Sequence, residues 1–179
     1  YNYGGIYLDS DVEVLKSFND LLQLPYFMGA EKAGTIEAAI LGAEKGTEWI
    51  KICLDYYTDK TFIKQDSSLD IRKLPEIMVE ELEKFKPIHY LDVEEMKNIK
   101  NMDFQKEILV MPNEYFSPKI FDSREVLITP RTYAIHHYQN SWFSHKAKIY
   151  YRTRTILIRI LGYNFIQKTE RILMPSRFK

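Results

Sequence analysis

Two carboxylates lie one residue apart near the start of the chain, in the segment YGGIYLDSDVE. Asp9 and Asp11 follow the apolar run Ile6–Leu8, which is typical of a β-strand. Because residues i and i+2 of a strand point to the same face, the two acids are expected to converge where the strand ends. Converging carboxylates repel each other unless a cation lies between them. Such oxygen ligands suit Mg²⁺ or Mn²⁺, which also hold diphosphates. The alternative is a pair of surface acids at a turn.

A second group of polar side chains gathers late in the chain, in the segment YAIHHYQNSW. Imidazole is a usable ligand for Mn²⁺, but His136 and His137 face opposite ways on a strand, so one of them at most is expected to reach a given site. Asn140, Ser141 and the Trp142 indole offer donors to phosphate oxygens. The alternative makes Trp142 a core anchor, Asn140 or Ser141 the cap of the last helix, and both histidines surface residues.

Short strands and helices mix along the chain without regular alternation, which predicts a mixed α/β fold. Ligands of open α/β sheets bind beyond the carboxyl ends of strands, and Asp9 and Asp11 follow such an end. Glu37 and Asp122 are interpreted as solvated surface acids. Strands are expected at residues 6–9, 12–15, 26–30, 36–43, 88–91, 108–111 and 132–137, and helical segments at 17–22, 47–57, 75–86, 92–99 and 143–161.

The composition limits the classes of protein. The chain of 179 residues is 45% hydrophobic, which is enough for one domain with a real core. Lys and Arg total 25, as do Asp and Glu, and this balance argues against a nucleic-acid partner held by bulk charge. The single cysteine, Cys53, excludes an internal disulfide framework. No apolar stretch approaches the roughly 20 residues that span a bilayer.

Positive charge concentrates at the C-terminal end. From His145 to Lys179 there are nine Lys or Arg residues and one acid, Glu170. Apolar residues interleave with these charges up to Leu161, which is typical of a basic amphipathic helix lying on an anionic membrane surface. The alternative is a helix that packs on the core and leaves a basic face in solvent.

The block GGIYLDSDVEVL, together with YAIHHYQNSW, resembles the DXD glycosyltransferases of family 32, which include bacterial capsular polysaccharide enzymes and fungal mannosyltransferases. The resemblance extends from Tyr1 to about Leu161, and IEAAILGAEKG resembles the next block of that family. It implies a GT-A-like fold, a Rossmann-like mixed sheet flanked by helices. The expected domain covers residues 1–162 and is followed by a basic tail, residues 163–179.

The resemblance also implies the roles of the site residues. Asp11 would bind Mn²⁺ or Mg²⁺ directly, with His137 or His136 as a further ligand, while Asp9 would hold the ribose or the water shell of the metal. Asn140, Ser141 and Trp142 would contact the diphosphate, with Trp142 near the leaving-group oxygen. The expected catalytic residues are Asp9, Asp11 and Trp142, and the expected donor-binding residues are Gly4, Gly5, Asp9, Asn140, Ser141 and Trp142.

The implied activity is that of a retaining hexosyltransferase. It would move a sugar from a nucleotide-sugar donor to a saccharide or lipid-linked acceptor in surface polysaccharide synthesis, in the cytoplasm or peripherally at the inner face of the membrane. The chain begins with Tyr1 rather than Met, and members of the family carry an Asp and an Arg on a helix before the glycines. An N-terminal nucleotide-binding portion is therefore expected upstream, and the chain alone is expected to be weakly active or inactive.

Two other functions are compatible with parts of the sequence. A phosphatase or phosphotransferase of the haloacid-dehalogenase type would use Asp9 as its nucleophile, but it normally has a small residue and then Thr where this chain has Val12 and Glu13. A non-catalytic interaction domain could keep a GT-A-like fold without the chemistry. The sequence leaves open the donor sugar and nucleotide, the acceptor and linkage, the choice between His136 and His137, and the oligomeric state.

Overall fold

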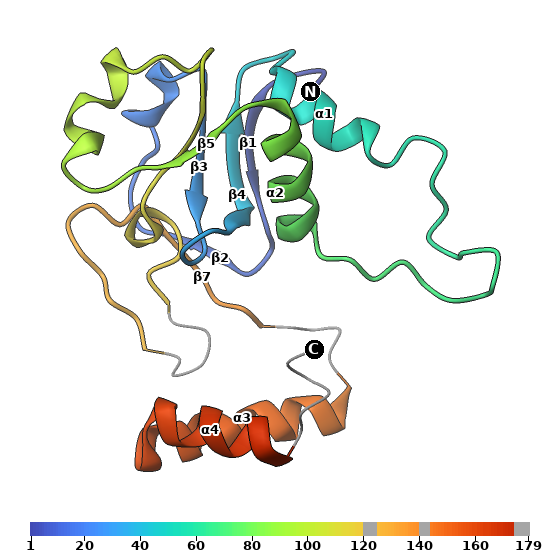
Figure 1. Ribbon diagram of the computed structural model, residues 1–179. Helices are drawn as coiled ribbons and strands as arrows, with labels where there is room; N and C mark the ends of the chain where they lie inside the picture. Colours follow the sequence, from blue (N-terminus) through green and yellow to red (C-terminus); the bar gives the residue numbers. More distant parts are fainter. Residues whose placement is uncertain (120–124, 140–143, 174–179) are drawn as a thin grey trace. The chain divides into compact units, whose positions relative to one another are not determined.

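A computed structural model describes residues 1–119, 125–139 and 144–173 (Figure 1). The chain divides into two compact units, one made of residues 1–118 and 128–136, the other of residues 119–127 and 137–179. The described part of the first unit mixes short strands with α- and 3₁₀-helices, and the named elements of the second unit are two α-helices. The mixed α/β class expected from the sequence is therefore confirmed. The domain extents 1–162 and 163–179 stay a prediction.

Three antiparallel strands form the main sheet of the first unit, in the order β1, β4, β3. They are β1 (Gly5–Leu8), β4 (Ile36–Ala43) and β3 (Tyr26–Ala30). The register of β3 on β4 shifts between Met28 and Gly29, so that Gly29 lies opposite Glu37. A shift of this kind is a β-bulge, which re-aims the side chains beside it.

The first unit also contains two further pairs of strands. The strands β5 (Ile88–Tyr90) and β6 (Ile108–Val110) pair in parallel, and Met111, just after β6, donates its N–H to the Met28 carbonyl of β3 at 2.9 Å. The strands β2 (Val12–Val14) and β7 (Ala134–His136) form an antiparallel pair. This pair joins the start of the chain to its late histidine segment.

Two helices, α1 (Glu48–Asp55) and α2 (Leu74–Phe85), lie beside one face of the main sheet (Figure 1). Pro75 in the first turn of α2 has a fixed φ that suits a helix start. The apolar faces of both helices pack with Met28, Ile36 and Val110 of the strands. Thr47 precedes α1 as expected, but its side chain does not cap the helix; its hydroxyl donates to the Glu44 carbonyl at 2.7 Å.

An aromatic cluster fills the core around β7. Its members, Phe18, Phe27, Tyr115, Phe116 and Tyr133, lie with ring centroids between 5.7 and 6.4 Å apart in each contacting pair. Three 3₁₀-helices surround this part of the core, η1 (Leu21–Gln23), η2 (Glu95–Asn101) and η3 (Asn113–Tyr115). The Tyr133 N–H donates to the Tyr115 carbonyl at 2.8 Å, so this core holds the backbone that leads into His136.

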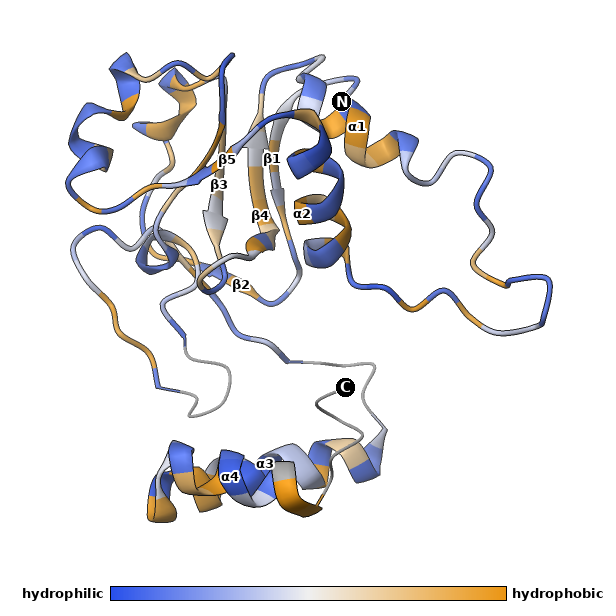
Figure 2. Cartoon of the chain, viewed as in Figure 1, coloured by the Kyte–Doolittle hydropathy of each residue, from blue (hydrophilic) through white to orange (hydrophobic). Residues whose placement is uncertain are grey.

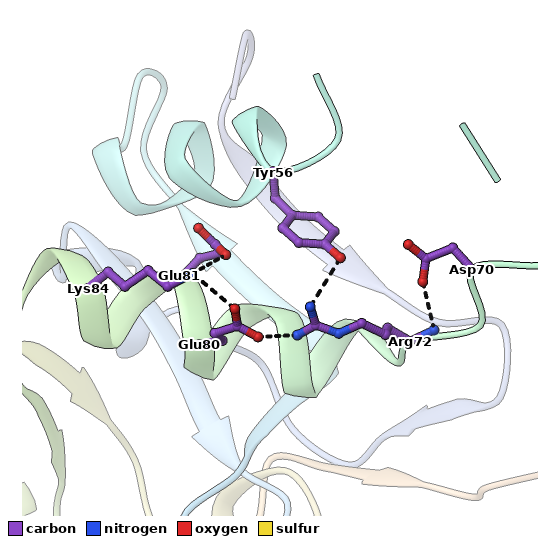
Figure 3. A network of polar contacts seen from close by, with 6 residues as sticks. All are labelled: Tyr56, Asp70, Arg72, Glu80, Glu81 and Lys84. Atoms are coloured by element: carbon purple, nitrogen blue, oxygen red, sulfur yellow. Dashed lines mark hydrogen bonds and ion pairs between the residues drawn. The ribbon is translucent and has the colours of Figure 1, made fainter. Parts of the chain in front are cut away.

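A polar network ties the long loop before α2 to both helices (Figure 3). The Arg72 guanidinium donates to the Tyr56 hydroxyl at 3.3 Å and pairs with the Glu80 carboxylate. Lys84 bridges Glu80 at 3.0 Å and Glu81 at 2.8 Å. These exposed pairs add little stability individually, but together they fix where the loop ends.

The second unit contains a pair of helices, α3 (His145–Leu161) and α4 (Tyr163–Leu173). The Ser144 side chain accepts the Ala147 N–H and caps α3. The expected cap, Asn140 or Ser141, is therefore wrong, although both of those residues lie outside the described part. Arg154 joins the helices through a bond from its Nε to Glu170 Oε1 at 2.8 Å. Figure 2 shows hydrophilic and hydrophobic residues along both helices.

Candidate functional site

A turn, rather than a strand, brings Asp9 and Asp11 together. The Val12 N–H donates to the Asp9 carbonyl at 3.1 Å, and the chain turns over residues 10 and 11 between β1 and β2. The two acids converge as expected, but not because they share one face of an extended strand. Their convergence follows instead from the tight reversal that begins where β1 ends, with the Asp9 N–H still paired to the Ala39 carbonyl of β4 at 2.9 Å.

His136 reaches the same turn from the other end of the sequence. It lies opposite Val12 in the pairing of β2 with β7, and its Nε2 is 3.5 Å from Asp11 Oδ1. Asp9, Asp11 and His136 each offer one ligand atom, and these atoms all lie within 4.8 Å of one another. We call these three residues the carboxylate–histidine cluster.

Behind His136 lies a carboxylate that the sequence analysis placed in solvent. Glu37 is only 3% exposed, so its interpretation as a solvated surface acid is wrong. His136 Nδ1 is 3.1 Å from Glu37 Oε2, and the Ser117 hydroxyl donates to the same oxygen. The signal in the sequence was an acid inside the apolar strand segment IEAAILGA, but its partners come from residues about 80 and 99 positions later.

The electrostatics of Glu37 and His136 depend on their mutual contact. Burial alone would raise the pKa of Glu37, but the hydrogen bond and charge of His136, together with the hydrogen bonds from Ser117 and Ala39, outweigh burial, and the pKa lies below its ordinary value. Burial alone would lower the pKa of His136, yet the contact with Glu37 and the charges of Asp11 and Asp9 raise it. Each group therefore favours the charged form of the other.

A residue of β1, the strand that precedes Asp9, holds the Asp9 side chain. The Tyr7 hydroxyl donates to Asp9 Oδ1 at 2.5 Å, and this bond is the main cause of a raised Tyr7 pKa. Tyr7 and Asp9 are two residues apart and therefore lie on the same face. One Asp9 oxygen is thereby oriented while the other stays available as a ligand.

The donor set fits a divalent cation. Two carboxylates and one imidazole combine oxygen ligands, which Mg²⁺ and Mn²⁺ prefer, with a nitrogen that Mn²⁺ also accepts. Asp11 and His136 keep side-chain exposures of 17% and 15%, so the cluster is open enough for a ligand to reach. A protein ligand set of this size leaves coordination positions for the oxygens of a diphosphate.

The first residues of the chain, which include Asp9 and Asp11, are similar to a known protein family. Residues 1–28 match the family of the glycosyltransferase sugar-binding region containing a DXD motif. The match runs through β1, the Asp9–Asp11 turn and β2 into β3. It confirms, over these residues, the resemblance to DXD glycosyltransferases, while the assignment to family 32 stays a prediction. No curated protein and no solved structure matches the chain.

The two glycines before the DXD motif have a structural use. Gly4 has a φ of +72°, and a Cβ there would lie 2.7 Å from the Lys45 backbone nitrogen. Only glycine allows this close approach of the chain to the turn after β4. Gly5 begins β1, four residues before Asp9, which is about 13 Å along an extended strand. The donor-binding role of Gly4 and Gly5 stays a prediction.

The remaining candidates lie in the second unit or outside the described residues. His137 belongs to the second unit, where the Lys119 ammonium donates to its carbonyl at 2.8 Å. Its role as a metal ligand stays a prediction. Asn140, Ser141, Trp142 and Asp122 lie outside the described residues, so the roles expected for the first three stay predictions too.

Proposed function

We propose that this chain is the catalytic part of a metal-dependent glycosyltransferase that uses a nucleotide-sugar donor. The observation that carries the proposal is the carboxylate–histidine cluster, whose ligand atoms lie within 4.8 Å of one another. Two of its members form the Asp-x-Asp sequence inside the residues that match the DXD family. The late His136 adds an imidazole ligand to the two carboxylates of that sequence.

The chemistry follows from where charge develops during sugar transfer. The bond between the sugar and the diphosphate breaks as negative charge accumulates on the departing phosphate, and a bound Mn²⁺ or Mg²⁺ supplies the neutralising charge. Asp9, Asp11 and His136 would hold that ion, and the Tyr7 hydroxyl keeps Asp9 oriented. We assign donors from Asn140, Ser141 and Trp142 to the diphosphate, where fixed donors would add a few kcal/mol of stabilisation.

Finer features of the proposal come from the sequence resemblance. We assign the chain to the family 32 enzymes with a GT-A-like fold, retention of anomeric configuration, and a role in surface polysaccharide synthesis in the cytoplasm. The acceptor would be a saccharide or a lipid-linked intermediate. The catalytic domain would cover residues 1–162 and the basic tail residues 163–179.

The helix α3 supports a peripheral contact with an anionic membrane surface. Lys146, Arg152 and Arg159 are exposed, and so are Ile149 at 65% and Ile160 at 71%. Basic and apolar side chains that alternate in this way suit the boundary between headgroups and acyl chains. None of the described helices is long and apolar enough to cross a bilayer. Co-sedimentation with phosphatidylglycerol vesicles, lost at high salt and absent with phosphatidylcholine vesicles, is the expected result.

The alternative with Asp9 as a phosphotransfer nucleophile has less support. The strand β1 that leads to Asp9 is antiparallel to its neighbour β4, whereas the ligand sites of doubly wound folds lie at the carboxyl ends of parallel strands. The non-catalytic alternative would leave the carboxylate–histidine cluster without a use.

Metal binding by the chain tests the proposal directly. We expect the electron paramagnetic resonance signal of free Mn²⁺ to decrease on titration with the chain, with about one ion bound per molecule. Asp11→Asn should weaken binding more than about tenfold, because it removes a charged ligand. Asp59→Asn is the matched control, since Asp59 is exposed at a φ of 60° that Asn also adopts. Equal Mn²⁺ affinity of Asp11→Asn and Asp59→Asn would refute the proposal.

A further inference from the structure

A buried glutamate stands directly behind the histidine of the carboxylate–histidine cluster. Glu37 lies on β4 next to the shift in register with β3, and only 3% of it is exposed. Burying a carboxylate is unfavourable unless its oxygens are hydrogen-bonded and its charge is paired. The contacts of Glu37 therefore indicate what the residue is for.

Within the described part of the chain, donors from three separate segments meet the two oxygens of Glu37. The Ala39 N–H donates to Oε1 at 2.9 Å, which fixes the carboxylate relative to its own strand. The Ser117 hydroxyl donates to Oε2. His136 Nδ1 is 3.1 Å from that same oxygen. The carboxylate is thus held from two sides and presents Oε2 to the imidazole.

The contact with Glu37 determines which nitrogen of His136 is available to a cation. An imidazole that donates its Nδ1–H to a carboxylate keeps its lone pair on Nε2. Nε2 is the nitrogen that faces Asp11, at 3.5 Å from Oδ1. Histidines that bind metals commonly donate their second nitrogen to a carboxylate, which fixes the ring and makes it a better ligand.

We propose that Glu37 is a positioning residue that selects the Nδ1–H tautomer of His136 and aims Nε2 at a divalent cation held with Asp9 and Asp11. The inference rests on the proposed function for the existence of the cation site. It adds that His136, rather than His137, is the ligand, and that Ser117 and the backbone of Ala39 hold the positioning carboxylate.

Two measurements test this role. The first is Mn²⁺ affinity, which Glu37→Gln should weaken about 10- to 100-fold, while Glu83→Gln, the same change on the exposed face of α2, should leave it unchanged. The second needs no metal: ¹⁵N NMR shifts of His136, assigned with His136→Gln, report the tautomer at a pH where the ring is neutral. We expect Nδ1–H in the unchanged chain and a shift toward Nε2–H in Glu37→Gln.

The outcomes separate this inference from the proposed function. If Asp11→Asn abolishes Mn²⁺ binding but Glu37→Gln binds Mn²⁺ within twofold of the unchanged chain, with the same tautomer, the role of Glu37 is refuted and the cation site stands. If Asp11→Asn leaves Mn²⁺ binding intact, the cation site itself is refuted. Should Glu37→Gln fail to fold, Glu37→Asp withdraws the carboxylate by one methylene and is expected to show the same loss of affinity.

Discussion

Val12 and His136 lie opposite each other in the antiparallel pairing of β2 with β7. This pairing places Asp11, one residue before Val12, beside the His136 ring. The cluster is therefore assembled by backbone hydrogen bonds between the two ends of the first unit, rather than by a local motif. Any change that disturbs the pairing is expected to separate the acids from the imidazole.

The first prediction distinguishes the two adjacent histidines. His136→Ala should weaken Mn²⁺ binding by more than about tenfold, since it removes the nitrogen that faces Asp11. His137→Ala should leave Mn²⁺ affinity unchanged, because the proposed cation lies at His136 and not at His137. The substitution removes the 3.4 Å contact of Lys119 with His137 Nδ1 but keeps the Lys119 bond to the His137 carbonyl. The measurement is a Mn²⁺ titration followed by electron paramagnetic resonance. The reverse order of effects would make His137 the ligand.

A second prediction concerns acid stability. Arg131 Nε donates to Glu114 Oε1 at 2.6 Å, and this bond holds the pKa of Glu114 below its ordinary value. A lowered pKa in the folded state adds stability above the unfolded pKa, and this stability is lost as the pH falls through the folded value. Urea unfolding between pH 6 and roughly pH 3 should therefore show a smaller acid-dependent loss in Glu114→Gln than in the unchanged chain. Equal losses would show that the pair contributes nothing.

Cys53 provides a third prediction, about chemical reactivity. Burial, with a smaller contribution from Glu81, raises the pKa of its thiol to about 11, and 8% of the residue is exposed. The thiolate is the reactive form, so alkylation by iodoacetamide near neutral pH should be slow in the folded chain and much faster in urea. Rapid modification without urea would mean that the packing of α1 on α2 opens readily.

The fourth prediction tests close packing beside Glu37. A Cβ on Gly29 would lie 2.6 Å from Cδ2 of Phe116, whose side chain is fully buried. Gly29→Ala should therefore lower the free energy of unfolding by about 1–3 kcal/mol. Phe116→Leu frees space at that contact, so the double variant should lose less than the sum of the two single losses. Additive losses would place the strain elsewhere.

The fifth prediction concerns the loop before α2. Arg72→Ala removes the contacts with Tyr56 and Glu80 that fix the end of this loop (Figure 3). Limited proteolysis should then cleave faster between residues 58 and 73, with little change in the melting temperature, because exposed ion pairs add little stability. Lys97→Ala, which removes another exposed ion pair, with Glu94, is the control and should leave the cleavage rate unchanged.

Much of the local structure could be predicted from the sequence. The apolar runs at residues 26–30 and 36–43 are β3 and β4 as expected, because such runs bounded by turn residues favour buried strands. Pro75 and Glu76 mark the start of α2 within a residue. The last long helix begins at His145, two residues later than expected, because Ser144 supplies the cap.

The parts that could not be predicted depend on contacts between distant residues. Glu37 was interpreted as a surface acid because no local pattern in the sequence indicates that Ser117 and His136 contact it. The Asp9–Asp11 turn was missed for a related reason. The sequence predicts strands on both sides of the acids, at residues 6–9 and 12–15, but the bond from the Val12 N–H to the Asp9 carbonyl that closes the turn is not visible in the pattern of residue types.

The strand β4 carries Glu37 inward and, two residues later, the Ala39 carbonyl that receives the Asp9 N–H. Side chains alternate between the faces of a strand, so a slip of β4 by a single residue would turn Glu37 to the opposite face and displace the partner of Asp9 together. Molecules with β4 in a shifted register would lose the contact of Glu37 with His136 and the backbone partner of Asp9 at the same time. Uptake of Mn²⁺ would thus report whether the sheet has been assembled correctly, and a preparation could be assayed for native pairing without any sugar substrate.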